Sequence, residues 1–183
     1  MIDALYDEVY IHKVVYDELL LSEVKQNVDA KLNDGWILFD PDDEDALSDY
    51  RYEIYNQYLV DVKQGFTDLD EKKTREGRPL KYTNDLGEMH SLAAAMLLGA
   101  SIIFSNDYDI LEDIKDSELR ITVDEAEDSE LIQHDTLVDF CFYLVVFDIE
   151  AKANVRKFLK AIQPFKVSVL DERLKQFQPK ETG

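Results

Sequence analysis

The sequence predicts an α/β fold with a mainly parallel central sheet, and three observations lead to this prediction. Short apolar runs typical of buried strands alternate along the chain with longer stretches of helical periodicity. The chain has 183 residues, enough for one domain with a substantial core. Hydrophobic residues make up 45%, and 6 Gly and 4 Pro are too few for a disordered chain. We therefore expect a single domain over residues 1–183.

The first part of the chain predicts strands and helices in alternation. A β-favouring run at Val9–Ile11 precedes apolar residues at helical spacing, which predict a helix from about Lys13 to Leu32. An Asn-Asp-Gly turn ends this helix, and Trp36–Phe39 has the composition of a buried strand. Aromatic and apolar residues then recur every four positions from Tyr50 to Val62 and predict a second helix.

Residues 64–85 are polar and predict a flexible loop. This stretch contains Gly65, Gly77 and Pro79, which interrupt regular structure. It also contains a basic cluster: Lys72, Lys73, Arg75, Arg78 and Lys81. The cluster is a candidate for RNA contact, but a short solvated loop is the simpler interpretation.

The last part of the chain predicts a strand at Leu131–Ile132 and a core helix at Leu137–Phe147, which complete a core spanning residues 1–148. Residues 149–183 are expected to form a C-terminal helical extension. Within it, the segment Phe165–Asp171 has two possible structures, a strand ending in Asp or a helix capped by Ser168. We expect the helix, because Ser168 followed three residues later by Asp171 resembles a capping box.

The charge balance excludes several classes of protein. Twenty Lys and Arg against 40 Asp and Glu give a net charge of −20, which excludes a histone-like binder of nucleic acid and disfavours anionic membranes. The longest apolar run, Phe140–Phe147, is too short for a membrane span. The acidic N-terminus is unlike a signal peptide, and Cys141 is the single cysteine. We therefore expect a cytoplasmic protein without a membrane partner.

The stretch from Asp85 to Ile110 is the most informative. Glu88 opens a helix rich in small residues, which Gly99 ends, and a short apolar strand follows at residues 101–105. Asp107 and Asp109 come directly after that strand. Ligands bind at the carboxyl edge of open parallel sheets, so this order is expected to bring Glu88 towards Asp107. Clustered carboxylates without His or Cys partners suit Mg²⁺ or Mn²⁺.

These residues carry a resemblance to the PIN domain family. The run from Gly87 to Asp107, G-E-x-x-S-L-A-A-A-x-x-L-G-A-x-I-I-F-S-N-D, resembles the second half of a PIN domain. Leu5–Leu19 resembles the family's second strand and helix, and Gly35–Phe39 resembles the strand that follows. The segment beginning at Phe165 resembles the family's closing segment. The resemblance implies a three-layer α/β/α sandwich and a Mg²⁺- or Mn²⁺-dependent ribonuclease.

The resemblance also implies a site. Glu18, Glu88 and Asp107 would be the metal ligands, and Asp109 would orient a metal-bound water; together the four would be the catalytic set. The ion would activate water and stabilise charge on a phosphate of single-stranded RNA. Metal binding would also allow an acidic protein to hold a phosphate.

One departure from the family pattern supports a second hypothesis. The family's first strand ends in an Asp of the metal site, and this chain starts at the segment that follows that strand. The family's first strand could be supplied in three ways: by another segment of this chain, by a partner chain, or by translation from an upstream start codon. The alternative function is a catalytically degenerate PIN-like scaffold that binds a protein or forms a homodimer. Each carboxylate also has a simpler interpretation as a surface, capping or turn residue.

Overall fold

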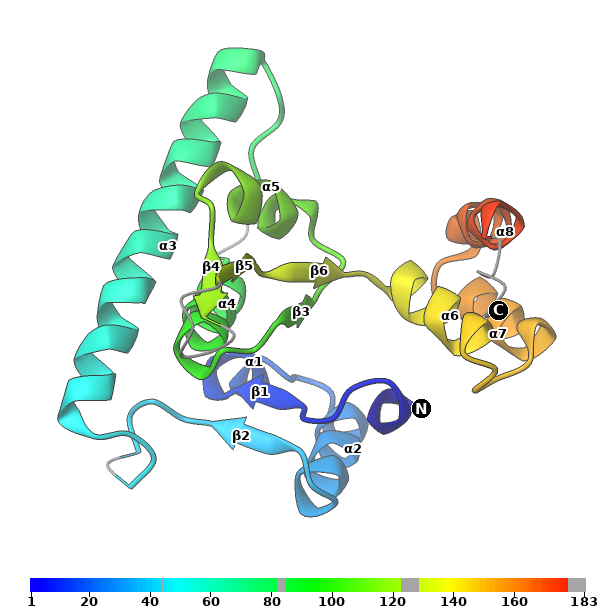
Figure 1. The fold of residues 1–183 in the computed structure, drawn as a ribbon, viewed down its shortest axis with the longest axis horizontal. Helices are drawn as coiled ribbons and strands as arrows, with labels where there is room; N and C mark the ends of the chain where they lie inside the picture. The colour runs from blue at the N-terminus through cyan, green and yellow to red at the C-terminus, as the bar shows by residue number, and fades with distance from the viewer. Residues whose placement is uncertain (44, 82–84, 123–128, 178–183) are drawn as a thin grey trace. The chain divides into compact units, whose positions relative to one another are not determined.

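The structure is a computed structural model that describes the chain except for residues 44, 82–84, 123–128 and 178–183 (Figure 1). Helices and short strands are mixed along the whole chain. In order they are η1 (Ile2–Ala4), β1 (Tyr10–His12), α1 (Lys13–Asp17), α2 (Ser22–Asn33), β2 (Ile37–Phe39), α3 (Asp49–Glu76), α4 (Leu86–Leu98), β3 (Ile102–Phe104), α5 (Tyr108–Asp116), β4 (Arg120–Thr122), β5 (Ser129–Leu131), β6 (Gln133–Asp135), α6 (Leu137–Val146), α7 (Lys152–Ile162), η2 (Pro164–Lys166) and α8 (Val167–Gln176).

The described strands form three two-stranded sheets, which confirms a mixed α/β fold. β1 and β2 are parallel, with Ile11 opposite Leu38. β3 pairs with β6, and β4 pairs with β5 in antiparallel orientation. The parallel pair β1–β2 is joined through the helices α1 and α2, which is the crossover that parallel strands require.

The chain divides into two compact units, which we describe separately. The first unit comprises residues 1–7, 104–106 and 135–183, and the second comprises residues 8–103 and 107–134. The sequence predicts a single domain in which a C-terminal helical extension begins at residue 149. In the structure, α6 belongs to the same unit as α7 and α8.

The predicted helix over residues 13–32 is interrupted in the structure. α1 ends at Asp17, and α2 begins at Ser22. The intervening Leu20 and Leu21 are exposed, and Leu21 has extended backbone angles as the N-cap of α2. The apolar spacing therefore predicted helix correctly on both sides of the break but gave no sign of the break itself.

The predicted loop at residues 64–85 is wrong for its first part, because α3 continues to Glu76. Ser48 caps the start of α3 by accepting a hydrogen bond from the Arg51 amide, and Gly77 ends it in the left-handed region at φ 67°. One face of α3 is buried along its length, and its members recur every three or four positions: Tyr55, Leu59, Val62, Phe66, Leu69 and Lys73. Because this buried face continues beyond Gly65, packing stabilises the helix past that residue. Residues 82–84 of the predicted loop lie outside the described residues.

The core of the second unit forms around α4, where small residues allow close packing. Leu92 and Ala93 are fully buried, and Ala94 and Ala95 are nearly so. One side of α4 joins a cluster with Val62 of α3 and Ile110 of α5, and the other joins a cluster with Phe39 and Tyr55. The second unit is therefore centred on the helix that carries Glu88.

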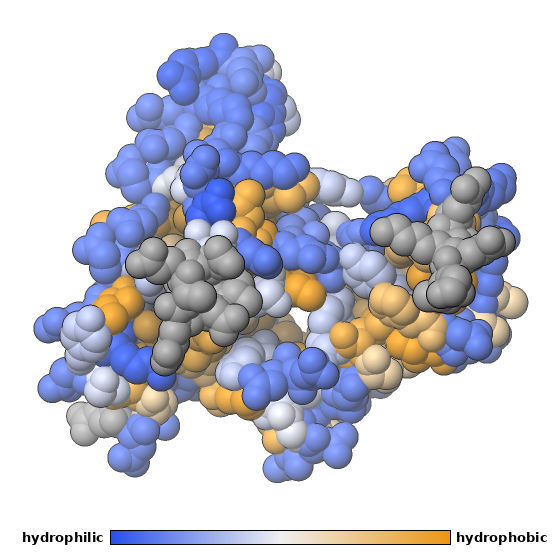
Figure 2. Space-filling model, viewed as in Figure 1, coloured by the Kyte–Doolittle hydropathy of each residue, from blue (hydrophilic) through white to orange (hydrophobic). Residues whose placement is uncertain are grey.

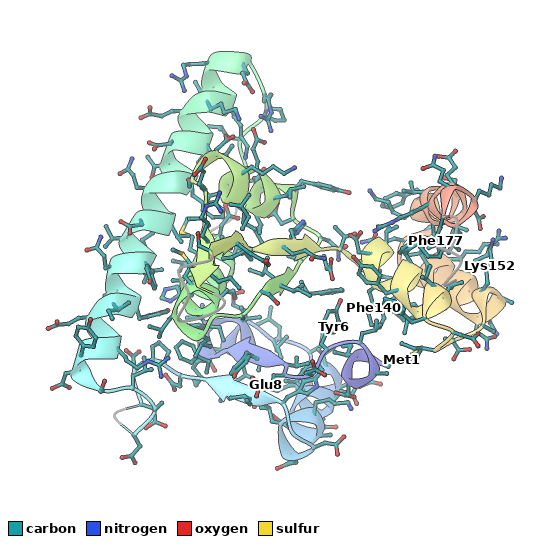
Figure 3. The ribbon with its side chains drawn as sticks, viewed as in Figure 1. Met1, Tyr6, Glu8, Phe140, Lys152 and Phe177 are labelled. Carbon is teal, nitrogen blue, oxygen red and sulfur yellow. The ribbon has the colours of Figure 1, made fainter. Side chains whose placement is uncertain are left out.

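The first unit is a helical assembly around α6. The predicted core helix at 137–147 is confirmed over Leu137–Val146, and a capping box between Thr136 and Asp139 begins it. Tyr6 donates a hydrogen bond to Asp135 Oδ2 at 3.0 Å and is labelled with Phe140 in Figure 3. The expected helix at 165–171 is present within η2 and α8, but Ser168 lies inside α8 and does not cap it.

None of the described helices is both long and apolar enough to cross a membrane.

Candidate functional site

The structure brings Glu18 to the first turn of α4, which carries Glu88. Glu18 follows α1 as its C-cap, and Gly87 is the residue before Glu88. A Cβ atom on Gly87 would lie 3.0 Å from Glu18 Oε2 and 3.2 Å from Val15 Cγ2. The absence of a side chain at Gly87 therefore lets α1 and the Glu18 carboxylate approach the helix.

Neither of these two carboxylates is neutralised by a basic side chain within the described part of the chain. Both lie near the N-terminal end of α4, where the helix dipole favours negative charge. Two acidic residues from separate segments thus lie in one region whose negative charge is not compensated by Lys or Arg. This is the electrostatic condition that a cation site requires.

Asp107 and Asp109 lie in a different environment, at the start of α5. Asp107 is the N-cap of α5 and accepts a hydrogen bond from the Asp109 amide at 2.9 Å. Asp109 is buried and forms ion pairs with Lys73 Nζ at 2.6 Å and with Lys81 Nζ at 3.0 Å. Lys81 also pairs with Asp107. These two carboxylates are therefore already neutralised by two ammonium groups of the protein.

The pKa of Asp109 reflects this arrangement. Burial alone would raise the pKa, but the hydrogen bonds from Lys73 and Lys81 outweigh it and hold the pKa below its ordinary value. Lys73 is itself only 3% exposed, so this ion pair gives a buried ammonium group its partner. The cluster is consequently an internal ion-pair network that ties α3 to α5.

The four predicted carboxylates differ in how well they suit Mg²⁺ or Mn²⁺. Mg²⁺ is commonly bound through one or two carboxylates, with water and substrate phosphate completing its shell. Glu18 and Glu88 match this chemistry. Asp107 and Asp109 do not in their paired state. Over the described residues, no three His, Cys, Asp or Glu side chains gather as a group able to hold a metal ion, so the three predicted ligands do not form one set.

The basic cluster predicted on a loop is also paired with carboxylates, on α5. Arg78 donates to both oxygens of Glu112, at 2.8 and 2.6 Å, and Lys72 contacts Glu112 and Asp116 at 2.9 and 2.5 Å. The hydrogen bonds from Arg78 and Lys72 lower the pKa of Glu112 to about 2. Most of this cluster therefore serves the packing of α3 on α5 and is not available as a surface for RNA.

A second polar network joins three elements of the same unit. His12 Nε2 lies 2.9 Å from the Tyr55 hydroxyl, and that hydroxyl lies 2.6 Å from His90 Nδ1. The Val14 amide donates to His12 Nδ1 at 3.0 Å, so this nitrogen is an acceptor. His12 Nε2 then carries the proton and donates to Tyr55, which leaves the Tyr55 hydroxyl to donate to His90.

Burial sets the protonation of this network. It lowers the pKa of His12 to about 4, with repulsion from His90 adding to the effect, and it lowers the pKa of His90 as well. Both rings are therefore neutral at physiological pH, as the tautomer assignment requires. His12 also caps α1, so the network connects the start of α1 to α4 through one hydroxyl.

Tyr55→Phe is expected to lower the free energy of unfolding by about 2 kcal/mol, because it leaves a buried donor on His12 and an acceptor on His90 without partners. Urea unfolding followed by the fluorescence of Trp36, the single tryptophan, measures this in the same unit. Tyr52→Phe is the matched control, since the Tyr52 hydroxyl makes an exposed 3.3 Å contact with Asp42. Equal losses in both variants would show that the network contributes nothing.

Local sequence patterns do not predict the network of His12, Tyr55 and His90. His12, Tyr55 and His90 are widely separated, and the histidines share no metal-ligand spacing. Lys73 was grouped with loop residues, although its position in the buried stripe of α3, four residues after Leu69, is a signal that periodicity offers.

No family model, no curated protein and no solved structure matches the chain.

Proposed function

We propose that this chain is a divalent-metal-dependent nuclease of PIN type that hydrolyses phosphodiester bonds in RNA. The observation that carries the proposal is the approach of Glu18 to Gly87, which precedes Glu88 in the first turn of α4. The family resemblance assigns these two residues to one metal site, although they are far apart in the sequence. The proposal includes a three-layer α/β/α fold, supported by the parallel pair β1–β2 and by the passage from α4 into β3.

In this proposal Glu18 and Glu88 hold Mg²⁺ or Mn²⁺. The bound ion supplies an activated water and stabilises charge on the phosphate. The chain contributes an uncompensated pair of carboxylates, and Gly87 provides the space for one of them. Asp107 as a third ligand stays a prediction that requires displacement of Lys81. Asp109 as the residue that orients water stays a prediction that requires displacement of both Lys73 and Lys81. A cytoplasmic location fits the free, buried thiol of Cys141.

The test is cleavage of single-stranded RNA by the purified chain as Mn²⁺ is added, together with the Mn²⁺ affinity. Glu18→Gln and Glu88→Gln are each expected to reduce cleavage on the order of 100-fold and to weaken Mn²⁺ binding, because each removes a charged ligand. Glu53→Gln, an exposed residue on α3, is the control and should leave both unchanged. Cleavage that survives both ligand substitutions would reject this site.

Lys81→Gln tests whether Asp107 is a metal ligand together with Glu18 and Glu88. If Asp107 joins the metal, removing Lys81 should tighten Mn²⁺ binding, because the ammonium group and the ion compete for the same carboxylate. If Glu18 and Glu88 hold the ion alone, the affinity should not change.

A second function is a non-catalytic PIN-like module that binds a protein partner or a second copy. Two observations favour it: the described residues contain no group of three metal-binding side chains, and Asp107 and Asp109 are neutralised by lysines. This function predicts no cleavage by the wild-type chain and no change in melting temperature when Mn²⁺ is added.

A further inference from the structure

The negative charge of the chain is unevenly distributed along the sequence. Residues 149–183 contain 8 Lys and Arg against 4 Asp and Glu, whereas residues 1–148 contain 12 against 36. The C-terminal segment is thus basic in a protein whose net charge is −20. At physiological salt, charges separated by more than about 8 Å are largely screened, so this segment presents its own local field.

Helix α7 concentrates that positive charge on one face. It contains four basic residues and no acidic one: Lys152, Arg156, Lys157 and Lys160. Lys152 lies at the edge of the stripe that Val155 and Leu159 bury, and Arg156, Lys160 and Lys157 lie progressively further round the same side of the helix. All four basic residues are exposed on the first unit, where Lys152 is labelled in Figure 3.

Half of these charges are not balanced by a carboxylate. Asp171 of α8 pairs with Arg156 at 3.2 Å and with Lys152 at 3.7 Å, which orients two of the four. Within the described residues, Lys157 and Lys160 form no ion pair. This contrasts with Lys72, Lys73, Arg78 and Lys81, which all contact acidic side chains.

The segment formed by α7 and η2 also carries exposed apolar side chains. Phe158 and Ile162 of α7 are 37% and 53% exposed, and Phe165 in the adjoining η2 is 71% exposed. Figure 2 shows hydrophobic and hydrophilic surface side by side over the unit that contains these helices. Cations that can follow a phosphate backbone, together with aromatic rings on which bases can stack, are the two components of a surface for single-stranded nucleic acid.

We propose that the basic face of α7, together with the exposed rings of Phe158 and Phe165 in the same segment, binds single-stranded RNA. The choice of RNA rests on the proposed nuclease function. An acidic protein or a second copy of this chain would also satisfy the charges. The exposed aromatic rings favour RNA, because charge pairing with an acidic protein gives them no stacking partner.

The experiment measures binding of the full chain to a fluorescently labelled oligouridine of roughly 12 nucleotides by anisotropy, in EDTA so that cleavage cannot occur. Salt is varied from about 50 to 200 mM. Four phosphate contacts predict a slope of about −3 for log K against log salt. The double substitution Lys157→Glu and Lys160→Glu should weaken binding at least tenfold and reduce the slope by about 1.4.

Two further variants test the surface. Lys63→Glu with Lys115→Glu makes the same charge change at exposed lysines of the second unit, and we expect only a small loss of affinity. Phe165→Ala should weaken binding about tenfold with an unchanged salt slope, because it removes stacking and not charge. Circular dichroism of each variant verifies that the helices remain formed.

The possible outcomes separate this surface from the nuclease site. RNA binding in EDTA without Mn²⁺-dependent cleavage supports the surface and rejects the nuclease function. Cleavage and RNA binding that are both unchanged in the α7 variants reject the surface and retain the nuclease function. Equal losses in the two double variants, or absence of RNA binding by the wild type, overturn the proposal. Self-association that is lost on Lys157→Glu and Lys160→Glu, without RNA binding, assigns the face to a second copy.

Discussion

Asp113→Asn is expected to stabilise the second unit by about 3 kcal/mol above pH 6.5 and to have little effect at pH 4. Asp113 is 0% exposed on α5, and its Oδ2 has no hydrogen-bond partner. Burial, with repulsion from Asp116 and Asp68, raises its pKa from 3.8 to about 6, although the Ser117 hydroxyl donates to Oδ1. A shift of roughly two pH units corresponds to about 3 kcal/mol.

The direction follows from the proton balance. Between pH 3.8 and about 6, the folded state holds a proton on Asp113 that the unfolded state has lost. The contribution of Asp113 to stability is therefore complete below pH 3.8 and is lost as pH rises through about 6. Asparagine has nearly the same shape and no charge, so the variant should not show this loss.

His12 acts in the opposite direction over an overlapping pH range, so the variant must be compared with the wild type at each pH. Its pKa is lowered from 6.5 to about 4, so its contribution to stability is complete above pH 6.5 and is lost as pH falls through about 4. The two dependences partly cancel in the wild-type protein. The difference between the Asp113→Asn and wild-type curves removes the His12 contribution and isolates Asp113.

Urea unfolding at a series of pH values, followed by Trp36 fluorescence, measures the difference curve. Asp61→Asn, an exposed carboxylate on α3, is the control and should give a difference curve close to zero. A difference between Asp113→Asn and wild type that is constant from pH 4 to pH 8 would contradict a buried, titrating carboxyl group.

The sequence predicted best what depends on local patterns. The order of helix, Gly99, strand and Asp107 appears as expected, because an apolar periodicity and a left-handed glycine are sufficient to define it. Gly99 does adopt the left-handed conformation, at φ 70°. The alternation of strands and helices likewise gave the mixed α/β class.

What the sequence missed depends on contacts between distant segments. The pairing of Lys73 with Asp109 needs α3 to lie on α5, and the hydrogen bonds of Tyr55 need β1 and α4 in place. The approach of Glu18 to α4 was predicted only through the family resemblance. Local spacing can place Lys73 on the buried face of α3, but it cannot identify the partner of Lys73 on α5.

Gly65 shows how a local rule can mislead. A glycine within a polar stretch favoured a loop, whereas Gly65 lies inside α3 against α5. A Cβ atom there would lie 2.2 Å from Asp113 Oδ1 and 2.6 Å from Ser117 Oγ. Those distances are far below van der Waals contact. The glycine is therefore required by the close approach of two helices and not by a turn.

Gly65→Ala is expected to destabilise the second unit by about 2 kcal/mol, although in an isolated helix the same change would stabilise by about 1 kcal/mol. The Asp113 carboxylate is buried and hydrogen-bonded to Ser117, so it cannot move into solvent to make room. Either α3 and α5 must separate or the carboxylate must leave its rotamer. Urea unfolding followed by Trp36 fluorescence measures the loss.

A double-mutant cycle tests the cause. In an Asp113→Ala background, the obstructing oxygen is absent and Ser117 Oγ is free to rotate away, so Gly65→Ala should become neutral or stabilising. The expected coupling between the two sites is about 2 kcal/mol or more, because the helix preference for alanine then acts without the clash. If Gly65→Ala lowers the free energy of unfolding equally in both backgrounds, the alanine side chain does not meet Asp113. That result would contradict the close packing of α3 on α5.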